Sequence, residues 1–404
     1  MLTVTEARER ILSHFSANPT ENIPLASARN RILAADIFAD GDHPPFDNSA
    51  VDGFALRAED TSASSVTLNV VADIPAGTTP KVSLQPGEAA RIMTGAQLPH
   101  GADSVIMVED TGAQHHGTGT NAPNTVTLAK QMQAGENIRT SGSDIRAGEM
   151  ILKQGRTLKA QDLGMLAVLG VAEVPVYQKA RVALLSSGDE LLDVNEPLQP
   201  GKIRDANSYS LAAAIESAGA EVIRLGVAKD TRESVTHLLN KAAEASADLI
   251  LSSAGVSVGA FDFIKEVIDS NGKMDFWKVN MRPGKPLAFG KYGGIPFIGL
   301  PGNPVSAFVG FEIFVRPVLE RVNGQMDGSR RTVRVRAEAE LHSDGRESYL
   351  RAKIRNENGA YFATLTGHQG SGNLLSLVQA DALLIIPAGV KCVPAGEEVD
   401  AILL

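Results

Sequence analysis

The chain has a single cysteine, Cys392, a single tryptophan and few aromatic residues, which make up 5% of its 404 residues. One cysteine excludes an intrachain disulfide and a zinc site built from cysteines, and it fits a reducing compartment. No apolar run approaches the roughly 18 residues that span a membrane, and charges from Glu6 onward interrupt any signal-peptide pattern. We therefore expect a cytoplasmic protein without a membrane partner.

The chain also lacks an excess of basic residues. It has 38 lysine and arginine residues against 47 aspartate and glutamate residues, which gives a formal net charge of −9. With this balance and no long basic stripe, nucleic acid is not expected as a partner. Because salt screens charges more than about 8 Å apart, a local cluster of cations can still bind an anion on this acidic protein.

Length and hydropathy patterning predict a multidomain protein, with about two to three domains expected at roughly 150 residues each. Short apolar runs alternate with helical periods over residues 181–323, which predicts a three-layered α/β domain with a parallel sheet. Residues 39–148 are rich in Val, Thr and Gly and carry turn signals, as is typical of a small β domain. After residue 328 the period changes to two, which indicates a compact β barrel or sandwich.

Two further segments complete the outline of the chain. The N-terminal run MLTVTEARERILSHF predicts an amphipathic helix, with Thr3 and Glu6 spaced as a capping box. Residues 149–180 contain one predicted helix, at about 159–169, between extended segments. This stretch is interpreted as a connector that leads into the α/β domain.

Between Leu184 and Ser306, four runs rich in Gly, Pro and small hydroxyl residues each follow a predicted strand. They are SSGDE at 186–190, SSAGVSVGAFD at 252–262, RPGKP at 282–286 and LPGNPVS at 300–306. Loops that leave the carboxyl ends of parallel strands gather at one edge of the sheet, where such sheets bind ligands. We therefore expect this edge to bind a phosphorylated ligand together with a divalent metal.

The same edge would carry both acids and cations. Adjacent acids such as Asp189 and Glu190 can ligate magnesium at a strand end, or one of them can simply cap a turn. Lys278 and Arg282 would share one face if both lie on one extended segment, because four residues is an even separation. Arginine grips oxyanions through a fork of donors and lysine acts as a point charge, whereas a solvated cationic face is the plainer alternative.

For other polar runs, the sequence does not decide between a structural and a functional role. Asp230 follows a predicted strand as either a helix N-cap or a metal ligand, and Asn303 or Ser306 can cap the helix that LPGNPVS starts. The remaining runs are PPFDNSAVDGFA at 44–55, RIMTGAQLP at 91–99, GSDI at 142–145 and TGHQGSGNLLS at 366–376.

Eight motifs in this order resemble the molybdopterin molybdenumtransferase family, often called MoeA, over nearly the whole chain. They are PPFDNSAVDGFA, RIMTGA, NIRTSGSD, LLSSGDEL, SSAGVSVGAFD, FWKVNMRPGKP, GLPGNPVSAF and TGHQGS. Each motif alone is weak, but their joint, ordered occurrence is highly specific. The resemblance implies a magnesium-dependent transferase that takes adenylated molybdopterin and molybdate, releases AMP and leaves molybdenum on the pterin dithiolene.

The resemblance also implies a domain order and an assembly. The domains would be an N-terminal helix (1–21) on the α/β domain, a connector (22–38 and 149–179), a β-rich domain (39–148), a MogA-like molybdopterin-binding α/β domain (180–327) and a C-terminal β barrel (328–404). The family's assembly is an elongated homodimer whose active site lies between the α/β domain of one subunit and the β domain of the other. A molybdopterin adenylyltransferase is suggested as a transient partner.

Site residues follow from the resemblance position by position. Glu190, Asp230 and Asp262 match acids assigned to magnesium and pyrophosphate, and Lys278 and Arg282 match cations for molybdate or phosphate oxygens. Asp52 and Thr94 would come from the β domain of the other subunit. The positions expected to bind substrate are Ser187, Gly188, Asp189, Ser253, Gly255, Ser257, Gly259, Lys285, Pro301, Asn303, Pro304, Asp144 and Ser371.

Two departures and two alternatives accompany the resemblance. Arg282 stands where the family pattern often has Lys, and Ala254 replaces a Gly of the usual SSGGVS run. One alternative is a molybdopterin adenylyltransferase, whose single α/β domain is related to the central domain, but such enzymes usually lack the domain that carries DNSAVDG and RIMTGA. The other is a non-catalytic scaffold of the same fold, against which the chain shows no added partner-binding segment.

Overall fold

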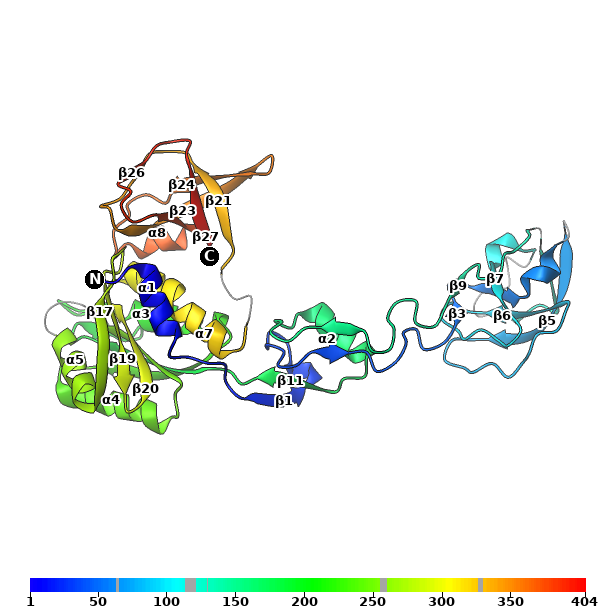
Figure 1. The fold of residues 1–404 in the computed structure, drawn as a ribbon, viewed down its shortest axis with the longest axis horizontal. Coiled ribbons are helices and arrows are strands. Elements are labelled where there is room, and N and C mark those ends of the chain that lie inside the picture. The colour runs from blue at the N-terminus through cyan, green and yellow to red at the C-terminus, as the bar shows by residue number, and fades with distance from the viewer. Residues whose placement is uncertain (63–64, 113–120, 129, 255–259, 326–329) are drawn as a thin grey trace. The chain divides into compact units, whose positions relative to one another are not determined.

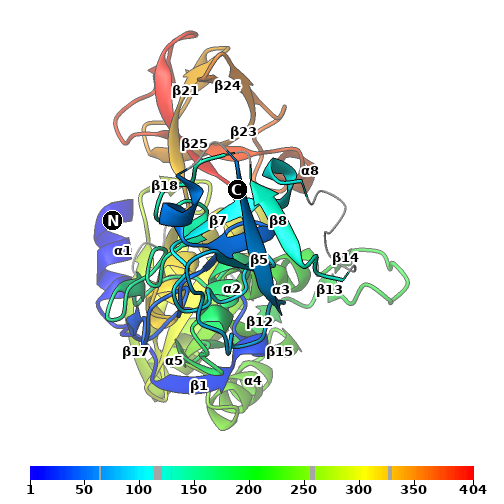
Figure 2. The same ribbon diagram turned by 90° about the vertical axis from the view of Figure 1, so that its right-hand side faces the viewer.

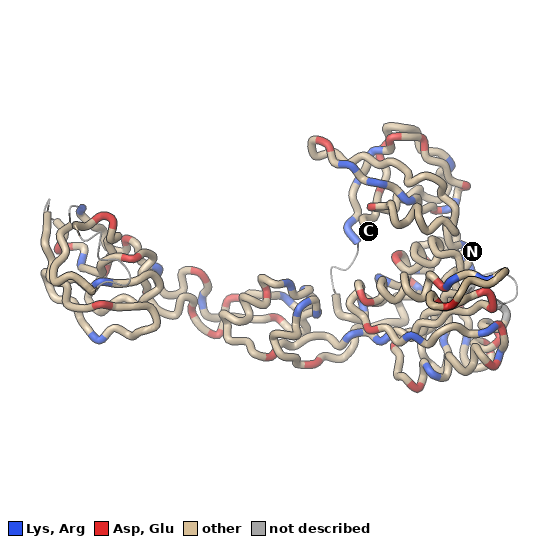
Figure 3. Tube along the Cα trace, turned by 180° about the vertical axis from the view of Figure 1, so that it is seen from behind, with Lys and Arg blue, Asp and Glu red and all other residues tan. Residues whose placement is uncertain are grey.

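A computed structural model describes residues 1–404 except 63–64, 113–120, 129, 255–259 and 326–329, with the backbone alone at 254, 260–262, 265 and 277 (Figure 1). The chain forms two compact units. The first unit comprises Met1–Ala35, Gln154–Leu166 and Val171–Leu404, and the second comprises Asp36–Lys153 and Ala167–Gly170. Acidic and basic residues are interspersed along the drawn trace (Figure 3). Among the described helices, none has the length and apolar character needed to cross a bilayer.

The centre of the first unit is a six-stranded sheet in the order β15-β12-β16-β20-β19-β17. The strands are β12 (Arg181–Ser187), β15 (Glu221–Ala228), β16 (Leu249–Ala254), β17 (Gly272–Lys278), β19 (Pro286–Tyr292) and β20 (Ile295–Pro301). β15, β12, β16 and β20 pair in parallel, as predicted. β19 runs antiparallel to both its neighbours, so the expectation of a wholly parallel sheet is wrong. A two-residue turn, Gly293 and Gly294, joins β19 to β20, and such a turn is too short for a parallel crossover.

Helices cover both faces of this sheet, which confirms the three-layered α/β architecture. Val182 and Leu184 of β12 point into one core with α1 (Val4–Leu12), α3 (Ala206–Ser217), α6 (Pro304–Gly310) and α7 (Arg316–Val322). Ala183 and Leu185 point into the other core, which α4 (Arg232–Glu244) and α5 (Ala260–Asn271) cover. Successive side chains of a strand alternate between faces, so one apolar run supplies both cores.

The N-terminal helix α1 begins as the sequence predicts. The Thr3 hydroxyl accepts a hydrogen bond from the Glu6 amide at 3.2 Å, and the Glu6 carboxylate accepts one from the Thr3 amide at 2.8 Å. Val4, Ala7 and Ile11 are buried in the α/β core. The connector follows as strand β1 (Thr20–Pro24), which pairs antiparallel with β11 (Glu173–Tyr177), and helix α2 (Ala160–Val168) lies in the second stretch of the connector.

Between β17 and β19 the chain leaves the α/β sheet over residues 279–285. β18 (Met281–Arg282) pairs in parallel with Glu347 and Ser348 of β23 (Glu347–Glu357), and the chain then returns as β19. The residues FWKVNM (276–281) therefore divide between two sheets. Met281 is fully buried, and its carbonyl accepts a hydrogen bond from Arg346 at 2.8 Å. β18 thus joins the α/β domain to the C-terminal domain.

The C-terminal domain is a closed β barrel, as predicted. Its strands β23, β24 (Ala360–Leu365), β21 (Thr332–Ala337), β27 (Glu398–Leu403) and β25 (Ala382–Ile386) pair in that order, and β25 pairs again with β23. They curl together at one end of the first unit (Figure 2). A short helix, α8 (Leu374–Val378), follows the TGHQGS run. Strands β22 (Leu341–His342) and β26 (Cys392–Val393) form a separate antiparallel pair.

The second unit is a β domain. Its five-stranded sheet has the order β7-β4-β6-β5-β8, formed by β4 (Gly53–Leu56), β5 (Val66–Ile74), β6 (Glu88–Ile92), β7 (Ser104–Met107) and β8 (Thr125–Leu128). Two small pairs accompany it: β2 (Ile37–Phe38) with β10 (Met150–Leu152), and β3 (Asn48–Ser49) with β9 (Ile138–Arg139). Apolar residues on the two faces of the sheet form two cores.

Buried charges lie where α6 and α7 join. The sequence predicts one helix over 305–322, but a π-helical turn, Phe311–Val315, interrupts it and places Glu312 inside. Burial acts to raise the pKa of Glu312, but hydrogen bonds from Arg316 and Arg330 outweigh burial and lower that pKa. Glu320, also buried, has an Oε2 atom with no hydrogen-bond partner among the described atoms, and burial raises its pKa to about 7.

Replacing Met281 with alanine should lower the free energy of unfolding by about 2–5 kcal/mol, because a buried side chain is lost and a cavity remains. Urea unfolding followed by circular dichroism measures this change. Met150→Ala is the matched control: Met150 is 51% exposed, so its stability should change by less than about 0.5 kcal/mol. Equal losses in the two variants would contradict the buried junction at β18.

Glu320 should make the protein less stable as the pH rises from about 5 to about 7. Its pKa is raised from 4.5 to about 7 in the folded chain, so between these values the folded state holds a proton that the unfolded state has lost. The contribution of Glu320 to the free energy of unfolding is fully present below its pKa in the unfolded chain. It declines as the pH rises to its pKa in the folded chain. Glu320→Gln, which does not titrate, should flatten this decline in urea-unfolding free energies. An unchanged pH slope in the variant would exclude Glu320 as its source.

Candidate active site

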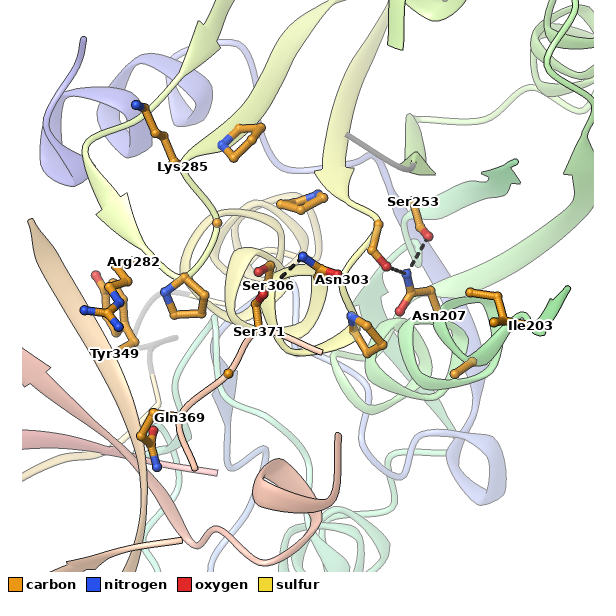
Figure 4. Close-up of a pocket in the computed structure, with 18 of the residues that line it drawn as sticks. Ile203, Asn207, Ser253, Arg282, Lys285, Asn303, Ser306, Tyr349, Gln369 and Ser371 are labelled. Atoms are coloured by element: carbon orange, nitrogen blue, oxygen red, sulfur yellow. Dashed lines mark hydrogen bonds between the residues drawn. The ribbon is translucent and has the colours of Figure 1, made fainter. Parts of the chain in front are cut away.

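A pocket of about 670 Å³ lies in the first unit at the carboxyl ends of β12, β16 and β20, beside the C-terminal barrel (Figure 4). All four glycine- and proline-rich runs contribute described residues to its lining. These include Ser187 and Glu190 from the first run, Ser253 from the second, Arg282 and Lys285 from the third, and Pro301, Asn303 and Pro304 from the fourth. The structure therefore brings the predicted loops together at one site.

The register of the sheet explains this convergence. Ser187, at the end of β12, lies opposite Ala254 of β16, and Ala254 lies opposite Pro301 of β20. Three separate strands thus end at the same level, and the loops that follow them start side by side. Parallel strands share this edge because each reaches it with its carboxyl end.

The third run reaches the pocket from the other side. Arg282 lies on β18, and the Val279 amide donates to the Lys285 carbonyl at 2.9 Å, which closes the loop between them. Gly284 has a φ of +99°, a backbone conformation that favours glycine. Arg282 and Lys285 are both exposed. Among the described residues, neither of them forms a salt bridge, so both charges are available to a ligand.

The C-terminal barrel adds two further arginines to the lining. Arg351 is fully buried and donates to Ser376 Oγ and to the Gly370 carbonyl, each at 3.1 Å. Burial, and then the positive charge of Arg282, lower the pKa of Arg351 to about 10, so it stays charged at neutral pH. Arg346 is paired with Asp344 at 2.5 Å. This side of the pocket is therefore strongly cationic.

Neutral polar groups form the opposite wall. Asn207 Nδ2 donates to Ser253 Oγ at 2.9 Å and to the Gly302 carbonyl at 2.7 Å, whereas its buried Oδ1 has no partner among the described atoms (Figure 4). Asn303 is the N-cap residue of α6, but its side chain makes no capping bond and instead donates to Ser371 Oγ at 3.1 Å. Asn303 therefore occupies the N-cap position, but its side chain holds the Ser371 loop and not the helix amides.

A group of carboxylates lies at the SSGDE loop. Asp230 accepts from Ser187 Oγ at 3.2 Å and from the Asp189 amide at 3.4 Å, and Asp189 accepts from the Asp230 amide at 3.2 Å. A side chain at Gly188 would start 2.6 Å from the Glu190 carboxylate, so glycine lets that carboxylate fold over the loop. Within the described chain no lysine or arginine forms a salt bridge with these three acids. Carboxylate oxygens are the ligands that a hard cation such as Mg²⁺ prefers, although in the described structure these three acids do not all converge within 4.8 Å.

Predicted residues of the second unit form a local group of their own. Asp52 Oδ1 accepts from both the amide and the hydroxyl of Thr94, each at 2.7 Å. This pairing joins the turn before β4 to the turn after β6 and leaves the Thr94 side chain exposed. Asp144 is exposed and accepts a 3.3 Å hydrogen bond from Ser143.

Some predicted residues are not brought to the pocket. Lys278 ends β17 and is exposed, whereas Arg282 lies on β18 in another sheet, so the two do not share one extended segment. Lys278 does not line the pocket, and its role stays a prediction. Gly255, Ser257 and Gly259 lie outside the described residues, as does the side chain of Asp262.

The sequence reasoning missed Arg351, Asn207 and Gln369, which all line the pocket. Gln369 fastens the TGHQGS loop to β23, because its amide group accepts from the Arg351 amide at 2.9 Å and donates to the Arg351 carbonyl at 3.1 Å. An arginine at an apolar position of a strand was the available signal for Arg351, since arginine is almost never buried without a partner.

Three protein-family models match nearly the whole chain. The MoeA N-terminal region (domains I and II) matches residues 2–170, a probable molybdopterin binding domain matches residues 183–321, and the MoeA C-terminal region (domain IV) matches residues 334–404.

Characterised relatives and a solved structure agree with these matches. A molybdopterin molybdenumtransferase of Nostoc sp. is 40% identical over 395 residues, covering 95% of this chain and 88% of the relative. The corresponding protein of Haemophilus influenzae is 38% identical and covers 99% of this chain and 98% of the relative. A crystal structure of a molybdopterin biosynthesis MoeA protein from Pyrococcus horikoshii matches with a TM-score of 0.84 and 34% identity, over 100% of this chain and 99% of that one.

Proposed function

Because this chain belongs to the MoeA family and is a molybdopterin molybdenumtransferase, which inserts molybdenum into adenylated molybdopterin, we propose that its reaction takes place in the 670 Å³ pocket. One observation carries this proposal: Arg282 and Lys285, exposed and without a salt bridge among the described residues, line the same pocket as the buried Arg351. Uncompensated cations at a concave site are suited to oxyanion substrates. The pocket volume falls within the roughly 300–1,000 Å³ typical of small-molecule sites.

The cationic side of the pocket is the proposed site for molybdate and phosphate oxygens. Arg282 can offer a planar fork of donors and Lys285 adds a point charge. The buried Arg351, whose Nε and Nη2 already donate to Ser376 and Gly370, adds positive charge behind them. The Ser371 hydroxyl, which accepts from Asn303, keeps its own proton free to donate to an oxyanion. Fixed donors of this kind stabilise a charge that develops during reaction without having to reorganise first.

The polar wall is the proposed site for the neutral parts of the pterin and nucleotide. The unpartnered Oδ1 of Asn207 can accept from a ring or amino N–H of a ligand, and such a bond would remove the cost of a buried acceptor without a partner. Pro301 and Pro304 add rigid, apolar surface beside it. Together these residues would hold the substrate with its anhydride toward the cations.

Glu190, Asp230 and Asp262, the acids that the family resemblance suggests, are proposed to hold Mg²⁺, with Asp189 beside Asp230. When bound there, Mg²⁺ would supply positive charge beside the phosphates. The protein's own part is to position two of these carboxylates, through the hydrogen bonds between Asp189, Asp230 and Ser187. Breaking a phosphoanhydride concentrates negative charge, so the arginines would stabilise that state more than the bound substrate.

We also propose that the active chain is a homodimer in which Asp52, Thr94 and Asp144 of one subunit complete the site of the other. The two hydrogen bonds from Thr94 to Asp52 support this proposal, because they fix a carboxylate beside an exposed threonine at one edge of the β domain. Transient contact with a molybdopterin adenylyltransferase would deliver the adenylated substrate.

Arg282→Ala should lower molybdate-dependent release of AMP from adenylated molybdopterin by about 100-fold in kcat/KM, the usual scale for removing one donor to a developing charge. The assay measures AMP at several molybdate concentrations. Lys273→Ala, which removes an exposed lysine of β17, should keep wild-type activity. Wild-type turnover in Arg282→Ala would place the reaction outside this pocket.

Mixing two inactive variants tests the shared site. Asp52→Asn and Arg282→Ala should each lose activity, but after subunit exchange half of the dimers are mixed and each has one intact site, so about one quarter of wild-type activity should return. Dimers in which both chains carry the same variant serve as the control. No recovery, with exchange verified by mass spectrometry, would mean that each chain supplies its own complete site.

A further inference from the structure

Three side chains with different donor atoms converge on the C-terminal domain away from the pocket. Glu340, His342 and Cys392 each offer one atom, and these atoms all lie within 4.8 Å of one another. His342 of β22 is the direct cross-strand neighbour of Cys392 of β26. Glu340 precedes His342 by two residues, so it projects to the same side of an extended chain. Backbone pairing therefore fixes His342 beside Cys392, and Glu340 stands directly before β22.

The three groups already contact one another. Glu340 Oε1 lies 3.1 Å from His342 Nε2, and the Cys392 sulfur lies within 4.8 Å of a ligand atom of each. The side chains of His342 and Glu340 are 73% and 55% exposed, and Cys392 is exposed as well. An ion from solvent can reach all three donors without any opening of the barrel.

The donor set selects a class of ion. Magnesium and calcium take oxygen ligands, whereas an imidazole nitrogen and a thiolate sulfur suit zinc and its first-row neighbours. Three protein ligands with a fourth position left to water form a common zinc arrangement. The single cysteine excludes a site made of cysteines, but it does not exclude this mixed one.

We propose that Glu340, His342 and Cys392 bind one divalent transition-metal ion of the zinc class per chain. As the metal–sulfur bond forms, the thiol proton passes to solvent, since cysteine coordinates as thiolate. The ion would link β22 to β26 through side chains as well as through the backbone. None of the three residues lines the 670 Å³ pocket, so this site is separate from the molybdenum chemistry.

Cobalt substitution tests the proposal directly. Metal-free, full-length protein is titrated with Co²⁺ in excess Mg²⁺, which occupies oxygen-only sites, and the thiolate-to-cobalt charge-transfer band is recorded. Because Cys392 is the only cysteine, any such band reports this site. We expect saturation at one equivalent, displacement by Zn²⁺ and complete loss of the band in Cys392→Ser.

Two ligand variants and one control make the test selective. His342→Ala and Glu340→Gln should each weaken Co²⁺ binding at least about tenfold, because even groups that only orient a ligand cost that much when removed. His237→Ala, at an exposed histidine of α4, should bind as the wild type does. The proposal is overturned by the absence of a band, by wild-type affinity in both ligand variants, or by saturation at half an equivalent with two chains sharing one ion.

Discussion

The alignment of three parallel strand ends is the constraint on which the pocket depends. Ser187, Ala254 and Pro301 lie at one level of the sheet, and backbone hydrogen bonds fix that level. Every loop that follows therefore starts at the same edge, whatever its own sequence. The cations reach this edge from outside the sheet, through β18 and β23. The candidate oxyanion site thus lies where the regular α/β sheet meets the segment that leaves it to form β18.

Much of the fold could be predicted because its signals are local. The capping box at Thr3 depends on residues three apart, and alternation along β12 reports a strand buried on both faces. The antiparallel direction of β19 was missed because an apolar run predicts a strand but not its direction in the sheet. The two-residue turn at Gly293 and Gly294 was the available signal, since it is too short for a parallel connection. The π-helical turn at Glu312 was missed because its stabilising partner, Arg330, comes from beyond the end of the helix.

The sequence predicted those parts of the candidate site that lie in loops directly after strands. Glu190 and Arg282 were found because they stand at recognisable strand ends. Arg351 was not, because its burial depends on Ser376 and Gly370 from a distant loop, and no local pattern encodes that contact. Lys278 shows the opposite failure: spacing placed it beside Arg282, but the chain changes sheets between the two residues.

The short strand β18 has a consequence for how this site can vary among related chains. It is held by main-chain pairing with β23, so the Cα of residue 282 is positioned independently of the side chain that it carries. Arginine or lysine can then stand at this position without any rearrangement of the scaffold. Substitution at residue 282 can therefore change the charged group while the backbone position that carries it stays the same.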